Sequence, residues 1–97
     1  MTTLDEIKKH LIEVKSVLRN EYDVIEIGIF GSFSRGEQTE YSDIDILVDY
    51  TKDITLLDIA RLQYYLEEVL KHKVDVVPKS CIRNELKPII SNELVSI

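Results

Sequence analysis

Two short apolar segments, residues 24–30 and 44–50, constrain the fold of this chain more than any other feature. Their sequences, VIEIGIF and IDILVDY, are rich in β-branched residues, which is typical of mostly buried strands. Because only a short polar stretch joins them, we expect the two strands to pair in antiparallel orientation. All three glycines of the chain lie between positions 28 and 36. Glycine occurs where the backbone turns sharply or closely approaches a ligand, so we expect unusual backbone geometry after the first strand.

Helices and further strands are expected around this pair. Apolar residues recur at three- and four-residue intervals over residues 4–18 and again over about 55–70, which predicts one amphipathic helix in each range. Residues 31–42 are polar without such a stripe and are expected to form a turn-rich loop. The other expected elements are a strand at 74–77 ended by Pro78, a short helix capped by Ser80, a helix with Pro88 in its first turn, and an edge strand at 94–97.

This order of elements predicts an α/β fold of the two-layer α+β kind. We expect a small mixed β-sheet of three to four strands, with helices packed mainly on one face. A length of 97 residues predicts a single domain, residues 1–97, with no separate domain to present an acceptor.

Charge and composition exclude several classes of protein. No apolar run is long enough to cross a bilayer, so no membrane association is expected. The net charge of −6 argues against direct nucleic-acid binding, because contacts between basic side chains and phosphates supply most of that affinity. The single cysteine, Cys81, cannot form an internal disulfide, which is typical of a reducing compartment and predicts a cytoplasmic protein.

The candidate catalytic residues are three aspartates. Asp43 and Asp45 stand two residues apart at the start of the second strand, so their side chains project to the same face. Two carboxylates held this close repel each other unless a cation lies between them, and oxygen ligands suit Mg²⁺ or Mn²⁺. Asp75, in the strand VDVV, would complete a three-carboxylate site that binds two metal ions. In isolation, Asp43 and Asp45 are equally well explained as exposed residues of a strand, and Asp75 alone is more often a surface residue than a catalytic one.

The candidate phosphate-binding residues follow the first strand directly. Gly31 and Ser32 offer backbone N–H groups and a hydroxyl that can surround phosphate oxygens, and Arg35 can add a charge-assisted contact. A Gly-Ser turn alone is usually only a turn. Its combination with Asp43 and Asp45 at the adjoining strand end favours a metal-dependent nucleotide site.

The segment GSFSRGEQTEYSDIDILV resembles the signature of the polymerase-β-like nucleotidyltransferases. With the preceding helix, the VDVV strand and the short length, the chain is similar to the minimal nucleotidyltransferases (MNT proteins). The resemblance implies the polymerase-β-like nucleotidyltransferase fold. It also implies that Gly31, Ser32 and Arg35 contact the triphosphate, that Asp43 and Asp45 hold the metals, and that Asp75 shares a metal and serves as base or only as ligand.

The same resemblance implies a function as an antitoxin. MNT proteins are commonly encoded beside a helical HEPN RNase toxin, so we expect a hetero-oligomer in which AMP passes from ATP to a toxin hydroxyl, expected to be that of a tyrosine, with two Mg²⁺ ions. One alternative is a non-catalytic antitoxin that blocks its partner sterically. The candidate apolar face for it is formed by Tyr64, Tyr65, Leu66 and Leu70, although the two leucines are better explained as core. Another alternative is a nucleotidyltransferase acting on a small molecule or an RNA end.

Overall fold

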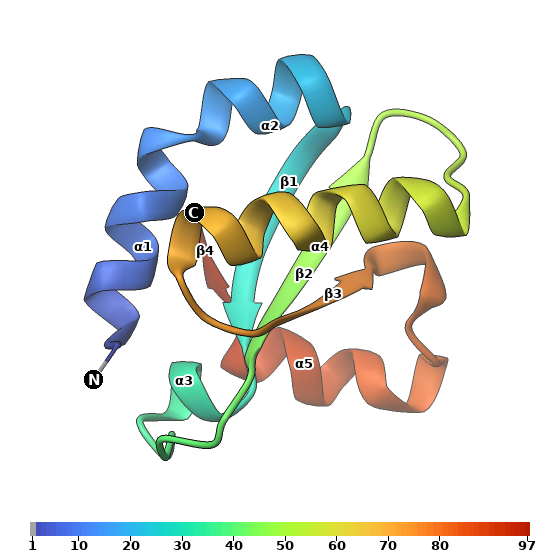
Figure 1. Ribbon diagram of the computed structural model, residues 1–97. Coiled ribbons are helices and arrows are strands. Elements are labelled where there is room, and N and C mark those ends of the chain that lie inside the picture. Colours follow the sequence, from blue (N-terminus) through green and yellow to red (C-terminus); the bar gives the residue numbers. More distant parts are fainter. Residues whose placement is uncertain (1) are drawn as a thin grey trace.

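A four-stranded mixed sheet forms the centre of the protein in the computed structural model, which describes residues 2–97 (Figure 1). The strand order is β3-β2-β1-β4. Strands β1 (Val24–Phe30) and β2 (Ile44–Tyr50) pair in antiparallel orientation, and β3 (Val74–Pro78) is parallel to β2. The short edge strand β4 (Val95–Ser96) is antiparallel to β1. The predicted mixed sheet and the bounds of its two main strands are confirmed, whereas Pro78 is the last residue of β3 rather than a residue beyond it.

Three helices cover one face of this sheet (Figure 1): α1 (Leu4–Glu13), α2 (Lys15–Tyr22) and α4 (Leu56–Leu70). The prediction of one helix over residues 4–18 is wrong, because the helix breaks at Val14, where φ is −103° and ψ is 8°. Apolar spacing does not reveal this break, since both halves present their buried residues, among them Leu11 and Leu18, to the same core. Within residues 2–97, no helix combines the length and apolar character needed to span a bilayer.

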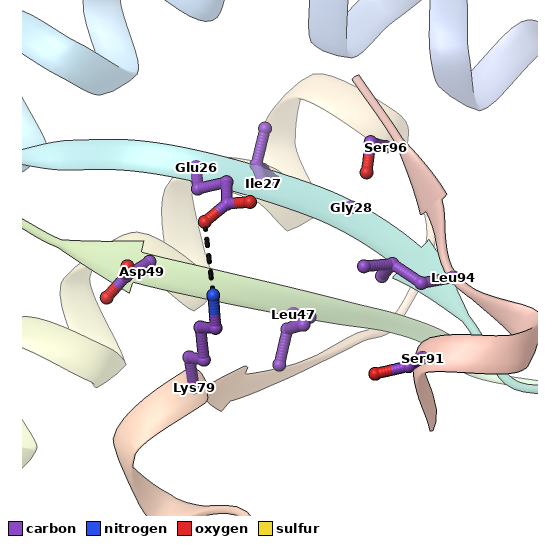
Figure 2. Close-up of a pocket in the computed structure, with 9 residues that line it drawn as sticks. All are labelled: Glu26, Ile27, Gly28, Leu47, Asp49, Lys79, Ser91, Leu94 and Ser96. Carbon is purple, nitrogen blue, oxygen red and sulfur yellow. Dashed lines mark hydrogen bonds and ion pairs between the residues drawn. The ribbon is translucent and has the colours of Figure 1, made fainter. Parts of the chain in front are cut away.

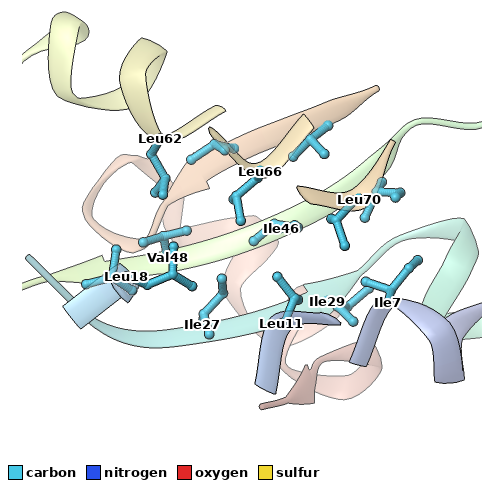
Figure 3. Close-up of a cluster of buried hydrophobic side chains, with 14 of the residues drawn as sticks. Ile7, Leu11, Leu18, Ile27, Ile29, Ile46, Val48, Leu62, Leu66 and Leu70 are labelled. Atoms are coloured by element: carbon cyan, nitrogen blue, oxygen red, sulfur yellow. The ribbon is translucent and has the colours of Figure 1, made fainter. Parts of the chain in front are cut away.

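The hydrophobic core lies between these helices and the sheet (Figure 3). Leu62, Leu66 and Leu70 recur every four residues on α4 and are buried against Ile46 and Val48 of β2. This burial confirms that Leu66 and Leu70 are core residues, so neither can belong to a partner-binding face. Tyr64 is 68% exposed, and Tyr65 stacks on Tyr22 with their ring centroids 4.9 Å apart.

The C-terminal segment covers part of the opposite face. Instead of the expected short helix after Ser80, two 3₁₀ turns occur, Lys79–Cys81 and Asn84–Leu86. Helix α5 (Lys87–Glu93) follows, with Pro88 in its first turn as predicted, and it lies behind the sheet in Figure 1. Helices are therefore packed mainly, but not only, on one face.

Candidate active site

The strand register brings Asp45 and Asp75 side by side. Asp45 is paired with Asp75 of β3 on one side and with Phe30 of β1 on the other. Residues directly opposite each other in neighbouring strands project to the same face, here the face away from α1, α2 and α4. Asp43 precedes β2 by one residue and is exposed. Ile44 and Ile46 are fully buried in the core, which is the alternation that the sequence predicted.

The backbone of Gly31 lies directly against the Asp45 carboxylate. Gly31 has φ of 78° and ψ of −154°, a conformation that residues with a side chain rarely adopt. A Cβ at this position would overlap Oδ2 of Asp45 and lie 3.1 Å from its Cγ. The close approach that glycine was expected to permit is therefore made within the protein itself, between the turn and an acidic residue of β2.

A one-turn helix, α3 (Ser32–Arg35), begins immediately after Gly31 where the sequence predicted only a loop. Four residues are too few to show helical periodicity, which explains the missed element. The hydroxyl of Ser34 donates to the Gly31 carbonyl oxygen at 2.8 Å, and the backbone N–H of Arg35 donates to the same oxygen at 3.2 Å. Ser32 is half-buried at the first position of this helix.

Glu93 is a site residue that the sequence did not reveal. Its Oε1 accepts the backbone N–H of Gly31 at 3.1 Å, and its Oε2 accepts Nη1 of Arg35 at 2.8 Å. Arg35 also donates through Nε to Glu37 at 2.9 Å. Glu93 ends α5, 62 residues after Gly31, so no local motif could connect the two positions.

Burial and excess negative charge raise the pKa of the Asp45 carboxyl. Burial raises the pKa of its carboxyl, and repulsion from Asp75 and then from Asp43 raises this pKa further. Glu93 adds a smaller repulsion, and Arg35 offsets part of the effect. The repulsion of Asp45 by the acidic groups around it thus exceeds its attraction to Arg35. A bound divalent cation would reduce this repulsion.

The three aspartates suit such an ion by their chemistry. They offer only carboxylate oxygens, the ligands that Mg²⁺ and Mn²⁺ prefer. Across residues 2–97, no three carboxylate, imidazole or thiol groups are already gathered closely enough to hold a metal. Asp43, Asp45 and Asp75 therefore remain predicted metal ligands, supported by donor type and by the repulsion around Asp45.

An open cleft of about 320 Å³ adjoins Asp45 and Asp75. The sheet contributes the two aspartates with Phe30 and Val77, and the C-terminal segment contributes the other lining residues: Cys81, Ile82, Arg83, Leu86 and Ile90. A second cavity on the same face holds about 100 Å³ and is crossed by an ion pair between Lys79 and Glu26 (Figure 2). None of the candidate site residues lines this second cavity. Of these two cavities, only the cleft is lined by candidate site residues, namely Asp45 and Asp75.

Comparison with known proteins identifies the family to which this chain belongs. The family described as "Nucleotidyltransferase domain" matches residues 11–97. The chain belongs to the nucleotidyltransferase family. The protein adenylyltransferase MntA of Thermococcus cleftensis is 42% identical to it over 97 residues, covering all of this chain and 98% of MntA. This nucleotidyltransferase is accordingly an enzyme of the protein adenylyltransferase class.

Solved structures agree with this assignment. A candidate minimal nucleotidyltransferase is 31% identical, with a TM-score of 0.84 and coverage of 99% of this chain and 97% of that one. A toxin–antitoxin crystallised with AMP-PNP is 26% identical, with a TM-score of 0.70, and the likeness covers 95% of this chain and 69% of that one. The nucleotidyltransferase described here thus has the polymerase-β-like fold that its signature implied.

Proposed function

We propose that this nucleotidyltransferase transfers AMP from ATP to a tyrosine hydroxyl of a HEPN RNase toxin, and that residues 1–97 act as one minimal antitoxin domain. The observation that carries this proposal is the position of Asp45, which lies between Asp75 on β3 and the Gly31 turn. The 42% sequence identity to MntA, over all of this chain and 98% of MntA, supports the reaction, and the toxin–antitoxin likeness supports the kind of partner.

In this proposal, each part of the site has a separate task. Asp43, Asp45 and Asp75 would hold two Mg²⁺ ions, which when bound neutralise the charge of the triphosphate. The Gly31–Ser32 turn and Arg35 bind and orient the phosphates. The cleft beside Asp75 is open, so a side chain of a second protein can enter it.

Transfer of AMP to a hydroxyl requires the following bond changes. The acceptor oxygen attacks the α-phosphorus and forms a new P–O bond, while the bond from that phosphorus to the β-phosphate oxygen breaks and releases pyrophosphate. Asp75 accepts the proton of the hydroxyl as it attacks. Alignment of the reacting atoms and neutralisation of charge supply most of the acceleration in reactions of this kind.

The test is incubation of the chain with the product of the neighbouring gene, Mg²⁺ and ATP labelled at the α-phosphate. We expect label on the neighbour and no label when the γ-phosphate carries it, because pyrophosphate leaves. Peptide mass spectrometry then identifies the modified residue. Asp43→Asn and Asp45→Asn should abolish transfer, whereas the matched control Asp49→Asn, a half-buried aspartate farther along β2, should retain it.

The steric alternative makes the opposite prediction. If an antitoxin with Asp43, Asp45 and Asp75 all changed to asparagine still silenced the toxin fully, binding alone would explain the protection and the catalytic proposal would be wrong. Label on a small molecule or on RNA, with none on the neighbouring protein, would instead favour the other acceptors.

A further inference from the structure

The carboxylate of Glu93 connects two of the candidate phosphate-binding residues, Gly31 and Arg35. One oxygen accepts the Gly31 N–H at 3.1 Å and the other accepts Nη1 of Arg35 at 2.8 Å. The side chain of Glu93 is only 18% exposed, compared with 66% for Glu37, the other carboxylate on Arg35. Hydrogen bonds that involve charged groups are stronger when shielded from water, and Glu93 is the better shielded of the two partners of Arg35.

This contact reaches across the chain. Glu37 is two residues from Arg35, just beyond the end of α3, whereas Glu93 is 58 residues away at the end of α5. Glu93 therefore fastens the C-terminal segment, which forms one wall of the cleft, to the turn beside Asp45. Its two oxygens fix the direction of a backbone N–H and of a guanidinium at the same time.

We propose that Glu93 is a positioning residue for nucleotide binding, acting through Gly31 and Arg35. This inference rests on the proposed function, in which the Gly31–Ser32 turn and Arg35 bind the triphosphate. Because the Gly31 N–H donates to Glu93, it holds the turn in place, and the phosphate contacts come from Ser32 and Arg35. An arginine carries five N–H donors, and the bonds to Glu37 and Glu93 use Nε and Nη1. They hold the guanidinium plane in one orientation, so the donors on Nη2 have a defined direction. The triphosphate then binds to groups that are already oriented, which lowers the entropic cost of binding.

Glu93→Gln separates this role from a general structural one. Glutamine has nearly the same shape but only one acceptor oxygen, so it cannot serve Gly31 and Arg35 together. Loss of one charge-assisted contact corresponds to about a tenfold weaker interaction. We expect the dissociation constant of AMP-PNP with Mg²⁺, measured by calorimetry on the chain alone, to rise by about this factor. Glu85→Gln, at an exposed position in the second 3₁₀ turn, is the matched control and should bind as the wild type does.

Kinetics with the labelled acceptor give a second readout. The KM for ATP should rise in Glu93→Gln, and in Glu93→Asp, whose shorter side chain keeps the charge but cannot reach both partners. A purely structural role would reduce the fraction of folded enzyme and therefore kcat, leaving the KM for ATP unchanged. Circular dichroism of each variant reports that folded fraction independently. In the Arg35→Ala background, Glu93→Gln should cost less binding than in the wild type, because one of its two targets is already gone.

The outcomes separate the two proposals. If the wild type binds AMP-PNP and Glu93→Gln binds it equally or more tightly, Glu93 is a bystander or a competitor of phosphate, and this inference is wrong while the proposed function stands. If the wild type binds no nucleotide, the proposed function is wrong and the inference falls with it.

Discussion

Replacement of Gly31 by alanine tests the geometry of the site most directly. The backbone at Gly31 has φ of 78° and ψ of −154°, a region that is almost restricted to glycine. Holding alanine there costs about 1–3 kcal/mol. The new methyl group would also overlap Oδ2 of Asp45, so either the turn or the carboxylate must move. We expect Gly31→Ala both to destabilise the fold and to abolish transfer of AMP.

Gly36→Ala is the control that separates these two effects. Gly36 also has a positive φ, 72°, but a Cβ built there meets no atom within 4 Å. Alanine in this left-handed conformation costs about 1–2 kcal/mol without displacing any site residue. Both variants should lose stability, Gly31→Ala more than Gly36→Ala because of the added overlap with Asp45, while only Gly31→Ala loses activity.

The assay combines thermal unfolding with label transfer well below the melting temperature. For a domain of this length, a loss of about 2 kcal/mol lowers Tm by about 8–16 °C. If folded Gly31→Ala transfers AMP as fast as Gly36→Ala does, the contact between the turn and Asp45 is irrelevant to catalysis. That result would refute the arrangement of the site proposed above.

Two further predictions concern pH and stability. Asp45→Asn should abolish transfer yet raise the free energy of unfolding at neutral pH, because burial and repulsion from Asp75 raise the pKa of Asp45 in the folded state. A carboxyl whose pKa is raised in the folded state favours folding at low pH, and this stabilisation is lost as the pH rises through the folded-state pKa. The difference in free energy of unfolding between Asp45→Asn and the wild type, measured with urea, should therefore be smaller in acid than at neutral pH. Thr55→Ala should cost about 1 kcal/mol in the same assay, because the Thr55 hydroxyl accepts the Asp58 N–H in the capping box that starts α4. The hydrogen bond from the Thr55 backbone N–H lowers the pKa of the Asp58 carboxyl in the folded state. The stabilisation by this carboxylate is therefore present at neutral pH and is lost as the pH falls through the folded-state pKa. If the wild type kept its stability in acid and Thr55→Ala had no effect on the free energy of unfolding, the role of the cap would be contradicted.

The parts of the fold that could be predicted are those whose sequence carries a local physical signal. The β-branched runs at 24–30 and 44–50 gave the correct strand bounds, because burial on a sheet selects such residues locally. The break at Val14 was not predictable from spacing, since the apolar stripe continues on both sides of it. The C-terminal segment carries few buried residues to define a period, so its sequence does not distinguish the two 3₁₀ turns from the predicted short helix.

The candidate site also has residues that a local sequence motif predicts and one residue, Glu93, that no local motif predicts. Asp43, Asp45 and the Gly31 turn belong to one short motif, so their proximity follows from a tight connection between two strands. Glu93 could not be found by this reasoning, because its contacts with Gly31 and Arg35 depend on how the last helix folds back over the sheet. Nothing in the residues around Glu93 distinguishes it from the other glutamates of this acidic chain.

Strand β2 explains why so small a fold can assemble such a site. Since β2 is antiparallel to β1, the start of β2 lies beside the end of β1, and Asp45 therefore meets the turn at Gly31. Since β2 is also parallel to β3, the starts of both strands lie together, and Asp45 therefore meets Asp75. The alternate residues of the same strand, Ile44 and Ile46, are fully buried under the helices on the other face. The core thus holds rigid the strand that carries the central carboxylate, while the opposite face stays open enough to admit a ligand.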